Sequence, residues 1–435
     1  MIKRLGVEYD VYIMSTMIRA NELRDINEHF DLRLKLVDLE FSRETVWLSC
    51  LRKLEKALFS HHFDIVTQKI KYQNEENWKA LLIQKLLRAL SFLNIIRTVL
   101  CLLRQTIIIL TSYSIRLKAL LPFHFDGVLS TSPLDSRENR VVNFLGRHCV
   151  KSLAMVISWD NLTSKGLINA DHDYVLVWND FMKTEFLRFY SIFTLELPKI
   201  AVTGIPRFDC YFHKQSEEYY EHARRRFNVP NGKLIILIAT SASRHFPNQK
   251  EIIADVLQFA RADGHVHVII RCHPADDEHA YKHLVKEQFV TLWHAGNLPE
   301  TKSECFYKWF PELDFLRSLS EMLRICNVCV QFASTMKLDA GACRKPIISI
   351  AYDGKISLPY HQSVKRLYDY AHQIPLNALQ IDKVVTNREQ LFNALKTSLQ
   401  KTDQGEGFSD ISPFTHFTKA ASVDFTAKTI AEWLG

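Results

Sequence analysis

The sequence predicts an α/β protein with two domains, each built on a parallel β-sheet. Three observations predict this fold: short β-branched runs alternate with longer helical patterns, several of these runs are apolar throughout, and the chain has 435 residues. Parallel strands are covered on both faces and therefore read as continuous apolar runs. Strand–helix alternation is typical of βαβ units. The length fits two or three domains of ordinary size.

The expected strands form one series before a strongly charged helical segment and a second series after it. They are Val11–Met14, Leu32–Val37, Phe63–Thr67, Gly127–Ser130, Ala154–Ser158, Tyr174–Trp178, Lys199–Thr203, Leu234–Ala239, His265–Arg271, Val290–Trp293, Val328–Phe332 and Pro346–Ala351. The charged segment is Tyr211–Arg226, and the turn-forming Val229–Lys233 follows it. We therefore expect a first domain over 1–215, a second over 216–405, and a tail over 406–435 that ends in an amphipathic helix.

Charge and cysteine content exclude several classes of protein. Lys and Arg number 55 against 48 Asp and Glu, a net charge of +7. This excess is modest, and no basic helix is interleaved with aromatic residues, so we expect no nucleic-acid partner. Nine scattered cysteines indicate reduced thiols in a cytoplasmic protein, and Met1–Ile13 lacks the apolar core of a signal peptide. Cys326 and Cys329 form one CxxC without a second pair at zinc spacing, which indicates structural thiols.

One segment is unusual because it carries basic residues and no acidic ones. Between Lys79 and Leu121 there are seven Lys or Arg side chains among apolar clusters. Arginines keep every apolar stretch below the roughly 18 residues of a spanning helix. Two readings remain open: a basic amphipathic surface (79–121) that lies on anionic lipid, or a buried helix pair whose arginines extend to solvent.

In the second half, polar residues follow three expected strands. Arg271 and His273, within Arg271–Pro274, come at the end of one strand, where ligands bind to open parallel sheets. Both side chains can donate hydrogen bonds to a phosphate. The turn Thr240–Arg244 follows another strand. Its donor-side candidates are Ser241, Ser243 and Arg244, although a surface loop has the same composition.

The segment after Val328–Phe332 reads as turn, helix, loop and strand. Ser334 or Thr335 falls at the expected N-cap, where amides and hydroxyls bind anions. Asp339 lies one helical turn further on, where a carboxylate can accept from ribose hydroxyls. The alternatives are an ordinary N-cap and a solvated aspartate. The sequence contains neither a dinucleotide-binding glycine motif nor a P-loop.

In the first half, the candidate catalytic residues are carboxylates. Asp160 follows the expected strand Ala154–Ser158 and is suited to act as a general base, or else it caps a turn. Asp135, after Gly127–Ser130, is the second candidate base. Asp171 and Asp173 form an Asp-x-Asp at the opposite, amino end of a strand, so we expect a turn there and no metal site.

Together these segments resemble glycosyltransferases of the GT-B fold. The resemblance covers about residues 125–355 and rests on the His-Pro after a strand and on Asn327–Ile348. The pairing of Arg271–Pro274 with Ser334 and Thr335 is similar to enzymes that use cytidine nucleotides, among them CMP-sugar transferases and CDP-glycerol glycerophosphotransferases. Ser158–Gly166 resembles bacterial surface-polysaccharide synthesis proteins.

The resemblance implies two Rossmann-like domains with a cleft between them, the first for the acceptor and the second for the donor. It makes His273 a ligand of the donor phosphates that offsets leaving-group charge. Ser334 and Thr335 would bind phosphate, Asp339 would bind ribose, and Asp160 would be the acceptor-side base.

The implied function is transfer of a sugar or polyol phosphate from a nucleotide donor to a glycan or lipid-linked acceptor. The product would be a surface polysaccharide such as a capsule or lipopolysaccharide. No resident cofactor or metal is expected, because the nucleotide-sugar donor is a substrate and His273 and Arg271 supply the positive charge. The basic segment would hold the enzyme on the inner membrane face. The alternatives are a sugar-nucleotide epimerase of the same fold and a non-catalytic scaffold in a polysaccharide assembly complex.

Overall fold

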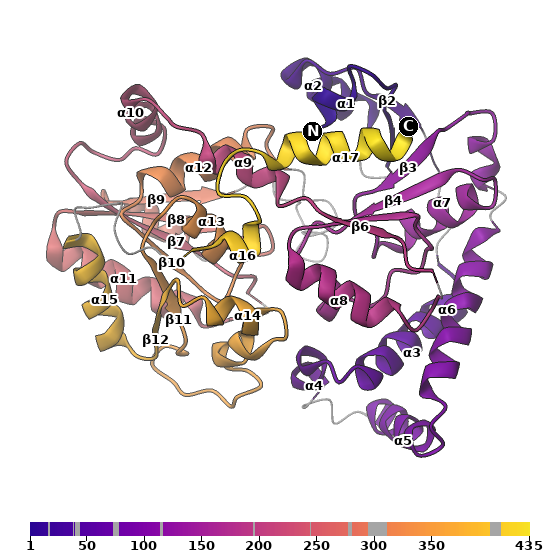
Figure 1. Cartoon of the computed structure of the whole chain (residues 1–435). Coiled ribbons are helices and arrows are strands. Elements are labelled where there is room, and N and C mark those ends of the chain that lie inside the picture. The colour runs from indigo at the N-terminus through magenta and orange to yellow at the C-terminus, as the bar shows by residue number, and fades with distance from the viewer. Residues whose placement is uncertain are drawn as a thin grey trace. The chain divides into compact units, whose positions relative to one another are not determined.

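A computed structural model describes the chain in the ranges 1–15, 18–37, 39, 44–72, 78–113, 116–194, 196–243, 245–276, 281–294, 311–400 and 410–435. It divides into two compact units; in Figure 1, unit 1 runs from indigo to magenta and includes the yellow helix at the C-terminus, and unit 2 runs from magenta through orange to yellow. Unit 1 consists of Met1–Pro206 and Ala421–Gly435, and unit 2 of Arg207–Ala420. The division falls nine residues before the expected boundary at 215. Unit 2 extends to 420 instead of 405, and the final helix belongs to the first unit.

Unit 1 has a four-stranded sheet of order β3-β4-β5-β6 in which all neighbouring strands are parallel. Its strands, with the separate parallel pair β1-β2, are β1 (Tyr12–Met14), β2 (Lys35–Val37), β3 (Gly127–Ser130), β4 (Lys151–Met155), β5 (Tyr174–Val177) and β6 (Lys199–Val202). Its helices are α1 (Ile2–Leu5), α2 (Ala20–Phe30), α3 (Val46–His62), α4 (Val66–Tyr72), α5 (Trp78–Phe92), α6 (Ile96–Ser112), α7 (Ser136–Gly146), α8 (Asp180–Tyr190) and α17 (Ser422–Leu434).

Unit 2 has a six-stranded parallel sheet of order β12-β11-β10-β7-β8-β9. Its strands are β7 (Leu234–Ala239), β8 (Val266–Cys272), β9 (Val290–His294), β10 (Val328–Gln331), β11 (Ile347–Ile350) and β12 (Lys383–Val385). Its helices are α9 (Asp209–Phe212), α10 (Glu217–Arg226), α11 (Gln249–Asp263), α12 (Phe315–Ile325), α13 (Met336–Ala342), α14 (Gln373–Ala378), α15 (Arg388–Gln400) and α16 (Ser412–Thr415).

The predicted α/β class with parallel sheets is confirmed. In unit 2, helix α11 contacts β8 and α15, whereas α13 contacts β10 and β11 and lies beside α9. Since right-handed crossovers leave β7 and β10 in opposite directions, these helices cover opposite faces of the sheet. Burial on both faces explains the continuous apolar runs: the side chains of Ile235–Ile238 in β7 are fully buried.

The C-terminal helix α17 is fastened to the sheet of unit 1. Lys151 Nζ donates to the carbonyls of Trp433 (2.9 Å) and Leu434 (2.7 Å), which caps the helix at its negative end. A Cβ at Gly127 would lie 2.5 Å from the ring of Trp433, so β3 needs glycine there. Ser422 Oγ donates to the Thr203 carbonyl (2.6 Å) at the other end of α17.

One expected strand is wrong, the expected strand Ala154–Ser158 begins and ends three residues earlier as β4, and one strand was not expected. Phe63–Thr67 spans the break between α3 and α4, where Asp64 adopts a left-handed backbone with φ 56°. A short apolar run is compatible with either a strand or a helix, so the pattern alone does not separate the two. β12 is a three-residue edge strand, too short to produce a recognisable pattern.

Helix α6, within the acid-free segment, is buried along one side only. Ile96, Leu100, Arg104 and Ile107 are buried, and α6 contacts α3 and α7. Over the described residues, no helix by itself has the length and apolar character needed to span a membrane. Lys85–Phe92 and Ile96–Ser112 reach that length and composition only as a pair, with a 116° bend between them.

Candidate functional site

In unit 2, the polar segments expected to bind a donor lie beyond the carboxyl ends of three adjacent strands. β10, β7 and β8 are neighbours in the sheet and run parallel, so the loops that follow them share one edge. The chain leaves β7 toward β8 and leaves β10 toward β11, so the strand order reverses between β7 and β10. In open α/β sheets this reversal point is where ligands bind.

His273 is held by one hydrogen bond from its main chain and one to its ring. Its own N–H donates to Thr240 Oγ1 (2.9 Å), and its Nδ1 accepts from the Ala275 N–H (3.0 Å). Because Nδ1 is an acceptor, the neutral imidazole carries its proton on Nε2. The half-buried His273 therefore presents a neutral N–H donor, which suits a phosphate oxygen better than a proton-accepting role.

The loop after β7 is tied to the loop after β8. Ser243 Oγ donates to Asp276 Oδ1 (2.6 Å), and the buried Gln249 bridges Ser241 and Asp276. The Ser241 hydroxyl itself makes no hydrogen bond to the described part of the chain. Arg244, also expected here, lies outside the described residues.

The loop after β10 carries Ser334 and Thr335 through a strained turn. Ala333 has φ 45°, a left-handed conformation that is uncommon for alanine, and Gln373 Nε2 holds its carbonyl (2.9 Å). Ser334 Oγ accepts from the Met336 N–H (3.2 Å), and the Ser334 N–H donates to Gln331 (2.8 Å). This loop is therefore held in one conformation from both sides.

Thr335 is the N-cap of α13, but its hydroxyl makes no capping hydrogen bond. Among the described residues this hydroxyl has no partner, so it is available to a ligand. Helix α13 spans only Met336–Ala342, and the N–H groups of Met336 and Lys337 donate to Ser334. Anion binding at this edge would therefore depend on hydroxyl groups more than on the helix end.

Two residues predicted to bind the nucleotide donor, Arg271 and Asp339, are buried in unit 2. Arg271 is 7% exposed, and its guanidinium lies 6.0 Å from the Trp293 ring and 5.9 Å from the Phe315 ring. Burial lowers the pKa of Arg271, against the nearby charge of Asp339. Arg271 therefore packs within the unit instead of pointing out from the strand end.

Asp339 is 1% exposed, and both of its oxygens are occupied. Its carboxylate accepts from the Arg207 guanidinium and from Tyr211 Oη (2.8 Å). Asp339 thus fixes the segment that begins unit 2, and the geometry does not support the ribose contact expected for it.

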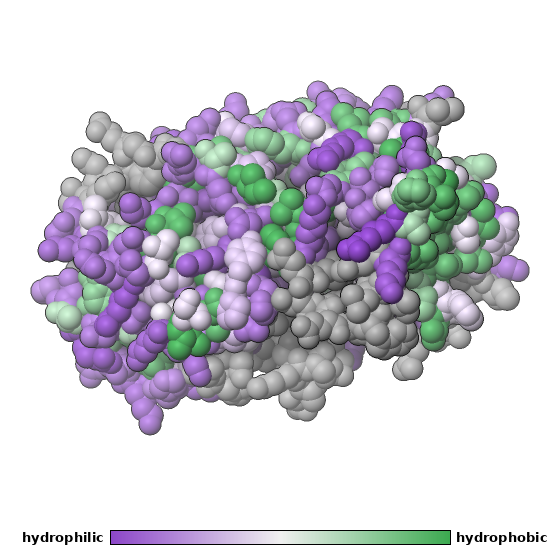
Figure 2. All heavy atoms as spheres, turned by 90° about the horizontal axis from the view of Figure 1, so that it is seen from below, coloured by the Kyte–Doolittle hydropathy of each residue, from purple (hydrophilic) through white to green (hydrophobic). Residues whose placement is uncertain are grey.

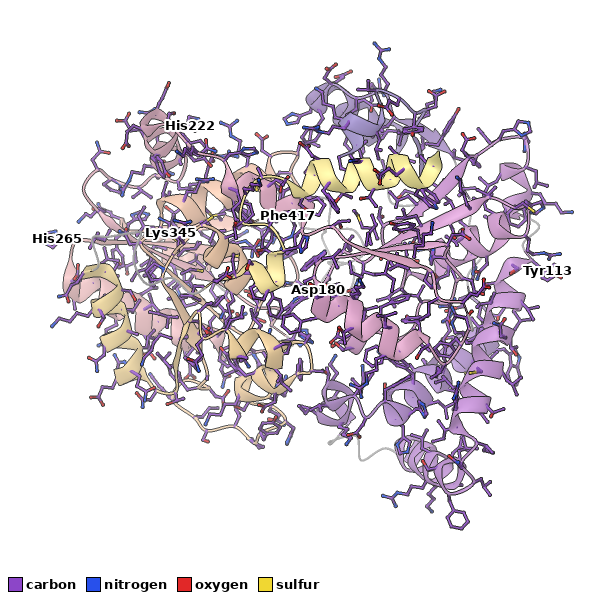
Figure 3. All side chains as sticks on the ribbon, viewed as in Figure 1. Tyr113, Asp180, His222, His265, Lys345 and Phe417 are labelled. Atoms are coloured by element: carbon purple, nitrogen blue, oxygen red, sulfur yellow. The ribbon has the colours of Figure 1, made fainter. Side chains whose placement is uncertain are left out.

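In unit 1, Asp160 lies beyond the carboxyl end of β4. Ser158 Oγ donates to its Oδ1 (2.5 Å), and Lys165 Nζ lies 3.3 Å from Oδ2. Its side chain is 21% exposed and makes no capping hydrogen bond to the turn Asn161–Lys165. Asp180, labelled in Figure 3, begins α8 at the same edge of this sheet. Asp160 keeps the partial exposure that a base needs.

Asp135 has a structural role. It caps α7 by accepting from the Arg137 N–H (2.7 Å), and it pairs with the Arg137 guanidinium at 3.0 and 2.6 Å. Burial opposes ionisation, but the hydrogen bonds from Arg137 outweigh it and lower the pKa of Asp135. A carboxylate that is held ionised in this way is a weak proton acceptor.

The Asp-x-Asp carboxylates also serve the fold. Asp171 pairs with Arg104 (2.9 Å), and Asp173 Oδ2 accepts from the Ser152 N–H (2.6 Å). Within the ranges that the structure describes, no three His, Cys, Asp or Glu side chains form a group able to hold a metal ion.

Sequence reasoning missed the residues that hold the loops. Gln249, Asp276 and Gln331 follow no motif, and each acts on a loop through one or two hydrogen bonds. Only their burial identifies them, because a buried polar side chain requires partners.

A family model described as CDP-Glycerol:Poly(glycerophosphate) glycerophosphotransferase matches residues 163–412, more than half of the chain. The Teichoic acid glycerol-phosphate transferase of Staphylococcus aureus (strain NCTC 8325 / PS 47) is 24% identical over 210 residues. That alignment covers 48% of this chain and 47% of the relative, so the chain spans about half the length of the curated relative that it matches.

The chain is also similar to solved structures. A Listeria monocytogenes protein provisionally assigned as a UDP-N-acetylglucosamine 2-epimerase is 12% identical and has a TM-score of 0.51, with 99% of this chain and 89% of that chain covered. The Wall Teichoic Acid Polymerase TagF is 17% identical with a TM-score of 0.39, over 60% of this chain and 58% of that chain. The Listeria structure shows the GT-B type of fold.

Proposed function

Because the chain belongs to the CDP-glycerol:poly(glycerophosphate) glycerophosphotransferase family, we propose that it transfers glycerol phosphate from CDP-glycerol to a hydroxyl of a surface polymer. The observation that carries this proposal within the structure is the edge where β10, β7 and β8 end. There the neutral Nε2–H of His273 and the hydroxyl of Thr335 supply hydrogen-bond donors of the kind that phosphate oxygens accept.

In the proposed reaction, the acceptor hydroxyl attacks the phosphorus that carries glycerol. The new P–O bond joins glycerol phosphate to the acceptor, the P–O bond to CMP breaks, and CMP leaves with the bonding electrons. Asp160 takes the proton of the acceptor hydroxyl. His273 donates to an oxygen of the departing CMP phosphate and so stabilises the charge that develops there.

The donor specificity is tested by comparing nucleotides on the same protein. A thermal-shift series with CMP, CDP, UDP, GDP and ADP at equal concentration measures selective binding, since a ligand stabilises the state that it binds. We expect shifts with CMP and CDP, and release of CMP from CDP-glycerol when poly(glycerol phosphate) is added. Turnover of UDP-N-acetylglucosamine without CDP-glycerol turnover would instead support an epimerase, and binding of no nucleotide would support a scaffold.

We also propose that this transfer needs no resident cofactor or metal. The support is chemical: N–H and O–H donors at the strand ends can stabilise phosphate charge without a cation. The measurement is the rate of CMP release after treatment with EDTA, compared with the rate after adding back Mg²⁺ or Mn²⁺. An activity that disappears with EDTA and returns with metal would contradict this part of the proposal.

A further part of the proposal concerns an anionic membrane surface. Helices α5 and α6 and the break between them expose apolar and basic side chains, here called the α5–α6 surface: Leu86, Arg88, Phe92, Leu93, Arg97, Leu102, Ile109 and Leu110. Figure 2 shows apolar side chains gathered on this part of unit 1. The side chains of residues 79–84 and residues 114–115, also within the expected segment, lie outside the described residues.

The composition of the α5–α6 surface favours lipid as its partner. Phe92 is 91% exposed and Leu102 64%, and the segment contains no acidic residue to repel anionic headgroups. Apolar side chains that enter the acyl boundary beside arginines that contact headgroups are typical of interfacial helices.

The membrane proposal is tested by sedimentation with vesicles of phosphatidylglycerol and phosphatidylcholine at low salt. We expect the double variant Arg88→Glu/Arg97→Glu to lose at least about 30-fold in binding, because each basic residue near such a surface contributes about 1 kcal/mol and two are removed. The matched control is Arg24→Glu/Arg33→Glu, the same charge change at exposed positions elsewhere in unit 1. Absence of wild-type binding to these vesicles would contradict the proposal.

A further inference from the structure

One buried side chain, Gln249, connects the two loops that surround His273. Gln249 is the first residue of α11 and is 2% exposed. The loops are the β7 loop, Thr240–Ser243, and the β8 loop, His273–Asp276. Sequence patterns give no role to Gln249, and the proposed reaction does not use it.

Gln249 uses its whole amide group in these contacts. Its Oε1 accepts from the Ser241 N–H (2.7 Å), and its Nε2 donates to the Ser241 carbonyl (2.9 Å) and to Asp276 Oδ1 (2.9 Å). The amide orientation follows from these partners, because a backbone N–H needs an acceptor and a carboxylate needs a donor. The β7 loop is therefore bound at both of the Ser241 backbone groups.

Asp276 is hydrogen-bonded both to the side chain of Gln249 and to the main chain of His273. It is 5% exposed, and its Oδ1 also accepts from Ser243 Oγ (2.6 Å). The Asp276 N–H donates to the His273 carbonyl (2.8 Å). The β8 loop is thus bound to the β7 loop by the side chains of Asp276 and Gln249, in addition to the bond between His273 and Thr240.

We propose that Gln249 and Asp276 are positioning residues that aim the Nε2–H of His273 at the donor phosphate. This inference rests on the proposed function. The ring orientation of His273 depends on the path of the β8 loop, because Nδ1 accepts from the N–H of Ala275, the residue directly before Asp276. Misplacing a reacting group by about 1 Å costs up to about 100-fold in rate.

The decisive variant is Gln249→Glu, which keeps the shape and the acceptor for the Ser241 N–H. It replaces the donor to Asp276 by a second carboxylate, so the connection is broken by repulsion without leaving a cavity. We expect kcat/KM for CDP-glycerol to fall about 10- to 100-fold, while KM for the acceptor polymer stays unchanged. A residue that only stabilises the fold would lower the melting temperature without this selective change in donor kinetics.

Rescue by a second substitution identifies the contact itself. In Gln249→Glu/Asp276→Asn the donor and the acceptor are exchanged, so the bond between the two side chains is restored. We expect the double variant to recover at least about fivefold of the lost kcat/KM, as coupled neighbours do in a double-mutant cycle. The matched control is Lys250→Gln, the same charge change at the next, exposed residue of α11, with kcat/KM within about twofold of wild type.

The outcomes separate this inference from the proposed function. Absence of CDP-glycerol turnover by the wild-type protein would overturn both. An active wild type whose Gln249→Glu variant has unchanged donor kinetics would overturn the positioning role alone, and so would a loss that Asp276→Asn does not reduce. If Gln249→Glu fails to fold, Asp276→Ala against Asp276→Asn decides the question: we expect a fall in kcat/KM with alanine only, and equal kinetics would overturn the role.

Discussion

The carboxyl edges of the two sheets are built differently. In unit 2, the loops that follow β7, β8 and β10 are held by hydrogen bonds from uncharged side chains distant in sequence, such as Gln249 to Asp276 and Gln373 to the Ala333 carbonyl. In unit 1, each candidate carboxylate is paired with a cation close in sequence, Asp135 with Arg137 and Asp160 with Lys165. The positions of the phosphate-binding candidates in unit 2 thus depend on tertiary contacts, whereas the charges of the unit 1 carboxylates are balanced by residues close in sequence.

The largest expected effect is at His273 and tests whether the unit 2 edge acts through hydrogen-bond donation. We expect His273→Ala to lower kcat/KM for CDP-glycerol by about 100-fold or more, because a preorganised donor to a developing charge is removed. His273→Gln places an N–H near the position of Nε2 and should recover about tenfold. Steady-state CMP release measures both variants.

Equal inactivity of the two His273 variants, with CDP binding intact, would instead indicate that the imidazole accepts a proton. The catalytic base would then lie in unit 2, and the proposed difference between the hydrogen-bond donors of unit 2 and the carboxylates of unit 1 would be wrong.

The second prediction distinguishes the two carboxylates of unit 1. Asp160→Asn should lower the single-turnover rate by about 100-fold with CDP affinity unchanged, since only the base is lost. Asp135→Asn should stay within about threefold of wild type, because asparagine caps a helix as well as aspartate does. The reverse result would make Asp135 the base and Arg137 part of the site.

A smaller effect is expected at Thr335, whose hydroxyl has no partner among the described residues. Thr335→Val keeps the shape and removes the hydroxyl, so we expect CDP affinity to weaken by about tenfold, equivalent to about 1.4 kcal/mol. The melting temperature without ligand should not change. Isothermal titration calorimetry measures the affinity, and an unchanged Kd would remove Thr335 from the donor side.

The last prediction concerns stability instead of activity, in unit 1, where Glu55 of α3 is 2% exposed. Burial raises its pKa to about 7, although Asn169 donates to its Oε2 (2.8 Å) and Arg104 lies near. Since the folded-state pKa is above the ordinary value of 4.5, this group stabilises the fold fully below pH 4.5 and loses that contribution as the pH rises through 7.

Glu55→Gln resembles the protonated side chain at every pH. We therefore expect it to raise the free energy of unfolding by about 1–3 kcal/mol at pH 8 and to change it little at pH 5. Urea denaturation at the two pH values measures this difference. An equal change in the free energy of unfolding at pH 5 and pH 8 would mean that Glu55 does not titrate in this range. The positive charges of Arg52 and Arg104 would then stabilise the buried, ionised carboxylate.

Much of the site could be located from the sequence because strand ends are local features. Apolar runs such as Leu234–Ala239 and Val328–Phe332 mark the strands, and the polar residues directly after them lie at the carboxyl edge. Arg271 and Asp339 show the limit of this reasoning. The position of a residue at a strand end or in a helical turn does not predict its side-chain contacts. Arg271 packs near Trp293, and Asp339 bonds to Arg207 and Tyr211.

The α/β class, the positions of most strands and the polar segments that follow them could be predicted from the sequence, since these depend on patterns a few residues long. The tertiary structure adds the contact between His273 and Thr240, the connection of the His273 loop through Gln249, and the return of α17 to unit 1. Each of these depends on contacts between residues far apart in the chain. No local pattern records such contacts, because they form only when the sheet brings its strand ends together.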